Sequence, residues 1–235
     1  MVTAQSVAVQ SVVDLSHPLY NNMPGLGGSV AVFWPQATHA NSSQISQGEV
    51  SSESHMILIS EHISTHFDCP SHFDPNGLST ETYPLERLVL PGLALDFSGW
   101  TVRKPILPSD FEAAADKAGK TIQPGSAVLA HTGQDALWGT PGFSMNRPFL
   151  PPETAEWLVD QDILLFGTDL IGVDDPDDWR WKTHNAFLRA NVPMVQQMCN
   201  IDALFGKDFL LVVLPLKMRD GTGCPVRPVG LVFAG

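Results

Sequence analysis

The sequence predicts an α/β or mixed α+β fold, in which a mixed β-sheet is flanked by a few helices. Apolar residues make up 43% of the 235 residues and charged residues 16%, which is typical of a packed globular core. Segments of strand length outnumber helical segments, and the two do not alternate regularly as in Rossmann or barrel chains. We therefore expect residues 1–235 to form a single domain.

The predicted strands are short apolar runs separated by turn residues. Nineteen prolines and nineteen glycines are spread along the chain and indicate many loops between these runs. Two runs are nearly continuous in apolar residues, which is typical of strands buried on both faces of a sheet. These two lie at residues 162–169 and 208–218, and the other four lie at residues 11–16, 56–60, 88–97 and 126–131.

Helices are predicted at three places. Residues 109–119 open with Ser109 and carry Glu112 three residues later, which is a capping-box pattern. Residues 151–162 begin with prolines, which are tolerated in a first helical turn, and place apolar residues on one face. A third, less strongly marked helix is predicted at residues 183–191.

Charge and cysteine usage exclude several classes of protein. The formal net charge is -12 at pH 7, whereas nucleic-acid binding relies on a basic surface. Cys69, Cys199 and Cys224 form no CxxC pair and indicate free thiols. The longest strongly apolar stretch, 209–216, is too short to span a membrane, and the N-terminus does not resemble a signal peptide. We expect a cytoplasmic protein that binds neither nucleic acid nor a membrane.

The segment EHISTHFDCPSHFDP, residues 61–75, concentrates groups that bind metals. His62, His66, Asp68 and His72 follow one another at separations of four, two and four. Nearby β-branched residues and a proline disfavour a long helix. A short turn passing into an extended stretch would instead bring His62, His66 and Asp68 to one point.

Two neutral imidazoles and a carboxylate suit zinc or manganese, and three protein ligands leave room for water, as in catalytic sites. The competing interpretation is a polar, hydrogen-bonded turn, because single histidines in loops are mostly solvated. Four chelating groups within eleven residues favour the metal site. The pattern is not the HExxH motif, because Ile63 follows His62.

The stretch HISTHFDCPSH resembles the HxGTHxDxPxH signature of the cyclase family, which includes bacterial kynurenine formamidases and isatin hydrolases. VVDLSHPLYNNMP, LPPETAEWLVDQDILLFGTD and LVVLPLKMRDGTGCPVRPVGLV resemble its other segments, so the resemblance covers nearly the whole chain. It implies a swivelling β/β/α domain, usually a homodimer or larger assembly. It also implies a bound divalent metal and hydrolysis of a C–N amide bond.

The resemblance also implies a role for individual residues. His62, His66 and Asp68 would bind the metal directly, and His72 would be the acid/base histidine. His184 matches a second metal-side histidine of the formamidases. Ser64 stands where the signature has glycine, a mild change if the backbone φ there is negative.

A second departure concerns the number of metal ions. The formamidases have a glutamate bridging two zinc ions where this chain has Gln196, with Gln197 the residue that a one-residue shift would select. A neutral amide is a poor bridge, because it adds no charge to offset the repulsion of two dications. We therefore expect one Mn²⁺ or Zn²⁺ per chain with Gln196 as an oxygen ligand, closer to the isatin hydrolases. The alternative is that both glutamines are ordinary polar residues at a strand end.

The resulting prediction is a metal-dependent amidohydrolase that acts on a small aryl amide or lactam, opening isatin to isatinate. Alternatives are an arylformamidase that releases formate from N-formylkynurenine, a lactone or ester hydrolase, a metal-binding sensor and a structural protein without metal. A sensor needs no acid/base group, so the presence of His72 counts against it.

Residues that contact the substrate are less clearly marked. Phe33, Trp34, Trp138 and Phe143 are candidates to hold an aryl ring, although aromatic residues are equally often core. Arg147, in the Gly- and Pro-rich stretch 138–148, is a candidate to face an anionic product. Residues 174–184 form either a rim beside the site or a solvated acidic turn, and the turn is favoured for their aspartates.

Overall fold

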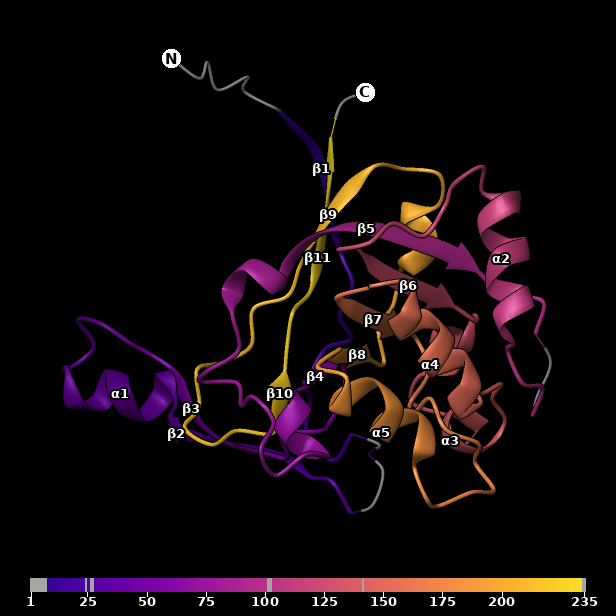
Figure 1. Cartoon of the computed structure of the whole chain (residues 1–235). Coiled ribbons are helices and arrows are strands. Elements are labelled where there is room, and N and C mark those ends of the chain that lie inside the picture. The colour runs from indigo at the N-terminus through magenta and orange to yellow at the C-terminus, as the bar shows by residue number, and fades with distance from the viewer. Residues whose placement is uncertain (1–7, 24, 26–27, 101–102, 141, 234–235) are drawn as a thin grey trace.

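The computed structural model describes residues 8–23, 25, 28–100, 103–140 and 142–233 (Figure 1). Its main feature is a nine-stranded mixed sheet with the order β1-β11-β9-β5-β6-β7-β8-β4-β10. The strands are β1 (Val9–Asp14), β4 (His66–Asp68), β5 (Val89–Asp96), β6 (Ala127–His131), β7 (Leu165–Thr168), β8 (Met194–Gln196), β9 (Phe209–Val212), β10 (Gly223–Pro225) and β11 (Val229–Phe233).

The centre of the sheet is parallel and its two flanks are antiparallel. β5, β6, β7 and β8 run in parallel, whereas β9 pairs antiparallel with β5 and β4 pairs antiparallel with β8. Parallel strands need crossover connections, and helices supply them. The mixed sheet therefore places the histidine motif on β4 and its C-terminal partners on the strands beside it.

Each face of the sheet carries its own hydrophobic core. Side chains alternate between the faces along a strand, so Val128 of β6 belongs to one core and Leu129 to the other. The first core packs the sheet against α2 (Pro108–Lys117), α4 (Pro152–Asp160) and α5 (Lys182–Arg189), which lie together on one side of it (Figure 1). The second core includes the 3-10 helix Ile201–Leu204.

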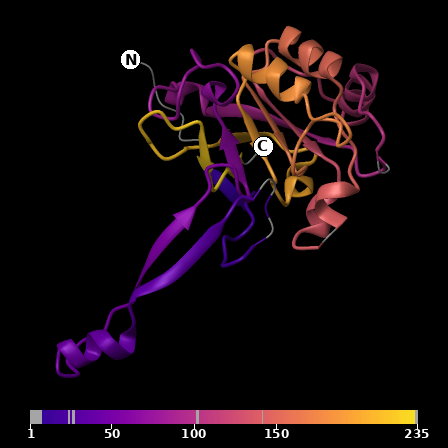
Figure 2. The same cartoon turned by 90° about the horizontal axis from the view of Figure 1, so that it is seen from below.

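A second, two-stranded sheet forms a long arm. β2 (Ala31–Ala37) pairs antiparallel with β3 (Ser54–Ile59), and α1 (His39–Ile45) lies between them in the chain. Figure 2 shows this hairpin extending away from the rest of the molecule with α1 at its tip. A short helix α3 (Gly142–Met145) and three more 3-10 helices, Pro70–His72, Leu85–Arg87 and Gln134–Leu137, complete the described elements.

All six predicted strands and all three predicted helices are present, with shifted ends. The largest shift is in 208–218, where β9 ends at Val212 and the chain then leaves the sheet. The apolar side chains beyond this point do not continue a buried strand, since Leu214 and Leu216 are exposed. The apolar run is therefore longer than the strand, and the predicted strand was wrong in its second half.

The predicted cap of the second helix was also wrong. The helix begins at Pro108, and the carboxylate of Asp110 accepts a 2.8 Å hydrogen bond from the backbone N–H of Leu107. The pair Ser109 and Glu112 therefore lies two residues too late to cap it. Proline at the first helical position fixes the start, because its missing N–H is not needed there.

Within the described parts of the chain, no helix is long and apolar enough to cross a membrane.

Candidate metal centre

The histidine motif turns sharply before it enters the sheet. Residues 61–65 form a series of bends, and β4 begins at His66. Ser64 lies at the reversal with φ +57°, in the left-handed region that favours glycine. The predicted turn into an extended stretch is therefore present, but the substitution of serine for glycine is not the mild change that a negative φ would have made it.

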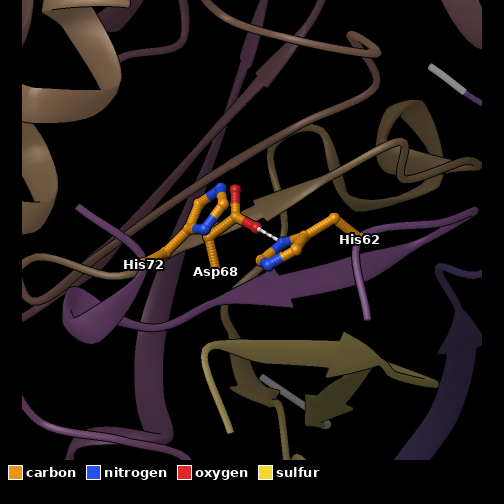
Figure 3. Close-up of side chains that lie close together, drawn as sticks. All are labelled: His62, Asp68 and His72. Atoms are coloured by element: carbon orange, nitrogen blue, oxygen red, sulfur yellow. Dashed lines mark hydrogen bonds and ion pairs between the residues drawn. The ribbon is translucent and has the colours of Figure 1, made fainter. Parts of the chain in front are cut away.

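Asp68 is the centre of the cluster. Its side chain is almost fully buried, and its Oδ1 lies 2.6 Å from Nδ1 of His62 and 3.2 Å from Nε2 of His66. His72 stacks on His62 with the ring centroids 3.8 Å apart. Figure 3 shows His62, Asp68 and His72 converging, and these three offer ligand atoms within 4.8 Å of one another.

The hydrogen bonds of His66 indicate that a cation belongs here. Its Nδ1 donates to the carbonyl oxygen of Ser64 at 2.7 Å, because a carbonyl only accepts. In the neutral ring, Nε2 then carries the lone pair, and it faces the carboxylate of Asp68. A lone pair and an anionic oxygen repel unless a proton or a metal ion lies between them, so the donor set fits a divalent metal.

The charges of the cluster are strongly coupled. Burial alone would raise the pKa of Asp68, but the neighbouring His66 and His62 hold it well below its usual value. Burial would lower the pKa of His66, but Asp68 outweighs this effect and raises it. Partial desolvation, and next the nearby His62, lower the pKa of His72 to about 4. His72 is therefore neutral at pH 7.

Three residues from the C-terminal half complete the site. Gln196 lies opposite His66 in the β4–β8 register, and its Nε2 donates to Oδ2 of Asp68. The same Nε2 lies 2.8 Å from Nε2 of His184, which is carried by α5. Nδ1 of His184 donates in turn to Oδ2 of Asp174. A continuous chain of polar contacts thus joins Asp174 to Asp68.

Asp174 is a functional candidate that the sequence interpretation missed. Its region was expected to be a solvated turn, but the side chain of Asp174 is buried. Its Oδ1 accepts a 2.7 Å hydrogen bond from the backbone N–H of Thr183. That expectation is wrong for this aspartate, although Asp177 follows it on the surface and Asp178 is partly exposed. The usable signal was its distance of ten residues from His184, because imidazoles near metals commonly donate to a carboxylate.

The amide of Gln196 is turned so that its nitrogen, not its oxygen, faces Asp68. Only the oxygen can bind a metal, and Oε1 has no hydrogen-bond partner among the described residues. A half-turn of the amide would exchange the two atoms. Gln197 has φ +55°, and its backbone is bonded to Leu170 and Thr65. Contact with Asp68 is thus made by Gln196.

The four aromatic candidates lie away from this polar chain. Phe33 and Trp34 are on β2 of the hairpin. Trp138 stacks on His17 with centroids 4.1 Å apart, and Phe143 packs edge-on against Trp138. Their role in substrate binding stays a prediction.

Two other aromatic residues lie beside the site, one on His184 and the other against the first. Phe73 stacks on His184 at a centroid distance of 5.4 Å, and Trp181 packs edge-on against Phe73 at 6.2 Å. Both were within segments that the sequence interpretation had marked, since Phe73 follows His72 and Trp181 precedes His184 by three residues.

A second group of potential ligands lies at the end of β6. His131, Asp135 and Asp169 offer atoms within 4.8 Å of one another. The carboxylate of Asp169 already accepts bonds from the N–H and hydroxyl of Thr132 and from the N–H of Gln134. These bonds hold the turn after β6, which gives Asp169 a structural role.

The histidine motif and the sheet around it match a known family. Residues 13–175, more than half of the chain, match the protein family described as "Putative cyclase". The chain belongs to this cyclase family. The resemblance that HISTHFDCPSH suggested is thereby confirmed.

Cyclase-family relatives include two kinds of named hydrolase. An isatin hydrolase of Roseibium aggregatum is 29% identical over 193 residues, covering 75% of this chain and 73% of that protein. A kynurenine formamidase of Bordetella petrii is 29% identical over 178 residues, covering 74% of this chain and 78% of the relative. One from Bacillus mycoides is 25% identical over 222 residues, covering 92% and 95% of the two chains.

Solved structures share the fold. An isatin hydrolase bound to the product analogue thioisatinate has a TM-score of 0.83 at 24% identity, covering 95% of this chain and 92% of the other. A potential metal-dependent hydrolase with cyclase activity has a TM-score of 0.72 at 24% identity, covering 94% and 96%. These similarities confirm the predicted fold class, a mixed sheet with a few flanking helices.

Proposed function

We propose that this protein is a metal-dependent hydrolase that cleaves the C–N amide bond of a small aryl amide or cyclic amide, with isatin to isatinate as the leading reaction. The observation that carries the proposal is the buried Asp68 with His62, His66 and Gln196 converging on it. The sequence similarity to an isatin hydrolase and to kynurenine formamidases supports the same reaction class.

His62, His66 and Asp68 would hold one divalent metal, Mn²⁺ or Zn²⁺, and Gln196 would add its oxygen once its amide has turned. When bound, the metal supplies Lewis acidity at the amide carbonyl and lowers the pKa of water. The Asp68 carboxylate is almost fully buried, so solvent screens its attraction to a cation only weakly. The imidazoles add neutral donors that keep the net charge of the site low.

His72 would move the proton. It is neutral at pH 7, because its pKa is lowered to about 4, so it can accept a proton from the attacking water. It then returns this proton to the departing nitrogen, and the acyl carbon becomes a carboxylate. Its ring stacks on His62, which holds it beside the metal ligands.

His184 and Asp174 would orient the other side of the site. Asp174 accepts the Nδ1 proton of His184, which fixes Nε2 toward Gln196. With Nδ1 donating, Nε2 of a neutral His184 is an acceptor, so it receives the N–H of the Gln196 amide at 2.8 Å. His184 would therefore act as a positioning residue.

An arylformamidase acting on N-formylkynurenine is the second candidate, supported by the kynurenine formamidase relatives. Gln196 disfavours it, because an amide adds no negative charge to hold a second dication. A lactone or ester hydrolase and a metal-binding sensor remain alternative outcomes of the same assays. The cytoplasmic location stays a prediction.

The test compares isatin and N-formylkynurenine as substrates of metal-stripped protein resupplied with Mn²⁺ or Zn²⁺, with metal counted per chain. We expect isatin turnover with one metal per chain, and a loss of at least about 100-fold in His72→Gln. His39→Gln, on the exposed hairpin, is the matched control and should retain activity. Metal binding without turnover of amides, lactams or esters would instead favour the sensor.

We further propose that two copies associate through the hairpin. Four large apolar side chains on it are 52–61% exposed: Trp34, Met56, Ile57 and Leu58. An isolated two-stranded hairpin is marginally stable in water, and clustered exposed apolar residues are typical of interfaces. The arm thus has the composition of a surface that a second subunit covers.

A further inference from the structure

Arg147 is a buried cation beside the proposed active site. Its side chain is only 6% exposed, and Nη1 donates to the backbone carbonyl of Asp174 at 2.8 Å. Its Nε has no hydrogen-bond partner among the described residues. Within the described chain, no carboxylate forms an ion pair with the guanidinium.

Burying a guanidinium without an anion is costly. Desolvation lowers the pKa of Arg147 to about 10, although Asp174 and Asp175 act against this effect, so the side chain is still charged at pH 7. The nearby carboxylate of Asp174 is already engaged by Thr183 and His184. Asp174 and Asp175 thus attract the charge of Arg147, but neither forms a direct ion pair with it, and the guanidinium can still receive an anion.

The free edge of Arg147 faces the same gap as Gln196. A side chain at Gly172 would place its Cβ 3.5 Å from Nη2 of Arg147 and 3.9 Å from Oε1 of Gln196. Because glycine has no side chain, a space that would hold one methyl group separates the guanidinium from the amide. The other end of the same amide contacts Asp68, so the gap adjoins the metal ligands.

We propose that Arg147 and the side-chain amide of Gln196 form a carboxylate-binding subsite across Gly172. The inference rests on the proposed function, and it narrows the ligands to acyl compounds that carry a carboxylate or acquire one. Amide hydrolysis by water always creates such a group, since the acyl carbon gains an oxygen as the C–N bond breaks. N-formylkynurenine also brings a carboxylate of its own.

A guanidinium suits this role better than an ammonium group. Its planar edge presents paired N–H donors that match a carboxylate, and such charge-assisted bonds are roughly twice as strong as neutral ones. If the Gln196 amide turns its oxygen toward the metal ligands, its nitrogen faces the gap and adds a second donor. The two side chains would then receive one carboxylate together.

The direct test is equilibrium binding to the metal-loaded protein by calorimetry. The probes are phenylglyoxylate and the neutral 1-phenylpropane-1,2-dione, which replaces the carboxylate by an acetyl group. We expect Arg147→Gln to weaken the binding of phenylglyoxylate at least about tenfold and to change the affinity for the dione less than about twofold. Arg227→Gln, which removes an exposed arginine paired with Asp14, is the matched control and should change neither.

A second variant guards against misfolding. Gly172→Ala adds a methyl group at an ordinary contact distance of 3.5 Å from Arg147, so the fold should tolerate it. The methyl group would occupy the gap and weaken the binding of phenylglyoxylate. We expect the metal content and the thermal unfolding temperature to stay unchanged. Unchanged carboxylate affinity in both variants, or equal loss of both probes, would overturn the proposal.

Kinetics distinguish the two sources of the carboxylate. A rise in KM for N-formylkynurenine but not for isatin in Arg147→Gln would assign the subsite to a carboxylate of the substrate. A rise in the inhibition constant of isatinate, with the KM for isatin unchanged, would assign it to the product. If neither compound is turned over, the proposed function fails, but the binding experiment still decides whether the subsite exists.

Discussion

At the scale of single residues, Ser64 shows how one backbone angle shapes the site. It lies at φ +57° between His62 and His66, and its carbonyl fixes the tautomer of His66. A left-handed conformation costs an L-residue roughly 1–2 kcal/mol. The hydroxyl of Ser64 returns little of this, because its contact with the carbonyl of His17 is 3.5 Å long.

We therefore expect Ser64→Gly to stabilise the protein by about 1 kcal/mol, because glycine removes the strain without removing a strong bond. Ser64→Val should destabilise it, since a β-branched side chain is excluded from this region. Urea denaturation measures both. Ser52→Gly is the control, because Ser52 is exposed and its φ is not in the left-handed region. This substitution should be neutral or slightly destabilising. An unstable Ser64→Gly would mean that the strain is smaller than the hydroxyl contact.

Some residues of the site lie in one short sequence motif, whereas others lie far from it along the chain. His62, His66, Asp68 and His72 were visible in the sequence because they fall within eleven residues. Asp174 and Arg147 were much harder to assign, because single acidic or basic residues in loops are common and most are solvated. Their burial beside His184 is a tertiary property.

At the scale of elements, the edge strand β10 determines how closely the metal motif can pack. Gly223 of β10 lies opposite Asp68 of β4. A Cβ at this position would come within 2.5 Å of both the ring of His62 and the backbone oxygen of Phe67. The backbone oxygen cannot move aside without breaking the β4–β10 pairing, so the strand needs glycine here.

Gly223→Ala should accordingly destabilise the protein by about 1–3 kcal/mol, as overpacking does, and displace His62 from Asp68. We expect the affinity for Mn²⁺ or Zn²⁺ to fall at least about tenfold, measured by equilibrium dialysis with metal analysis. Gly99→Ala, where no heavy atom lies within 4 Å of the added Cβ, is the matched control. Wild-type metal affinity in the Gly223 variant would show that the His62 position is adaptable.

A second element-scale contact joins the end of β5 to α2. Asp96 accepts bonds from the N–H and hydroxyl of Ser98 and from Nζ of Lys117. Burial would raise the pKa of Asp96, but these bonds lower it from 3.8 to about 2. The folded pKa is thus below the unfolded one, so the contact stabilises the protein above about pH 4 and is lost as the pH falls toward 2.

Asp96→Asn should lower the free energy of unfolding at pH 7 by less than about 1 kcal/mol, because the pair with Lys117 is exposed and screened. The difference from wild type should shrink between pH 4 and pH 2, as measured by denaturant unfolding across that range. Asp116→Asn, on the exposed face of the same helix, provides the control. A difference that grows on acidification would contradict the assigned direction.

The sequence prediction missed β2, β4, β8, β10 and β11, and the three of these that surround the metal motif are the shortest. β4, β8 and β10 have three residues each, so they are too short for an alternating pattern to be recognised. β7 was recognisable because buried parallel strands are nearly continuous in apolar residues. The elements that carry the site are therefore the ones that local sequence specifies least.

At the scale of the whole molecule, the hairpin of β2 and β3 is the least self-sufficient part. Trp34, Met56, Ile57 and Leu58 belong to none of the hydrophobic clusters, and Figure 2 shows the arm standing clear of the sheet. Burial of apolar surface contributes about 25 cal/mol per Å², so covering this arm with a second copy would be strongly favourable.

We expect the protein to be a homodimer in light scattering coupled to size exclusion, and Leu58→Glu to shift it toward the monomer. A charge at the centre of the exposed apolar surface would have to be desolvated on association. Gln44→Glu, an exposed change on α1 of the same arm, is the control. A monomeric wild type would remove the proposed role of the hairpin.

The sequence by itself determined the fold class, six of the strands, three helices and the cluster from His62 to His72, because these depend on neighbours along the chain. The resemblance to the cyclase family already assigned Gln196 and His184 to the site, but only the tertiary structure shows their contacts around Asp68. It also adds Asp174 and leaves Arg147 buried beside them. Gln196 lies 128 residues from Asp68. Contacts over such separations depend on strand order and register, which follow from the packing of the entire sheet and not from any local pattern.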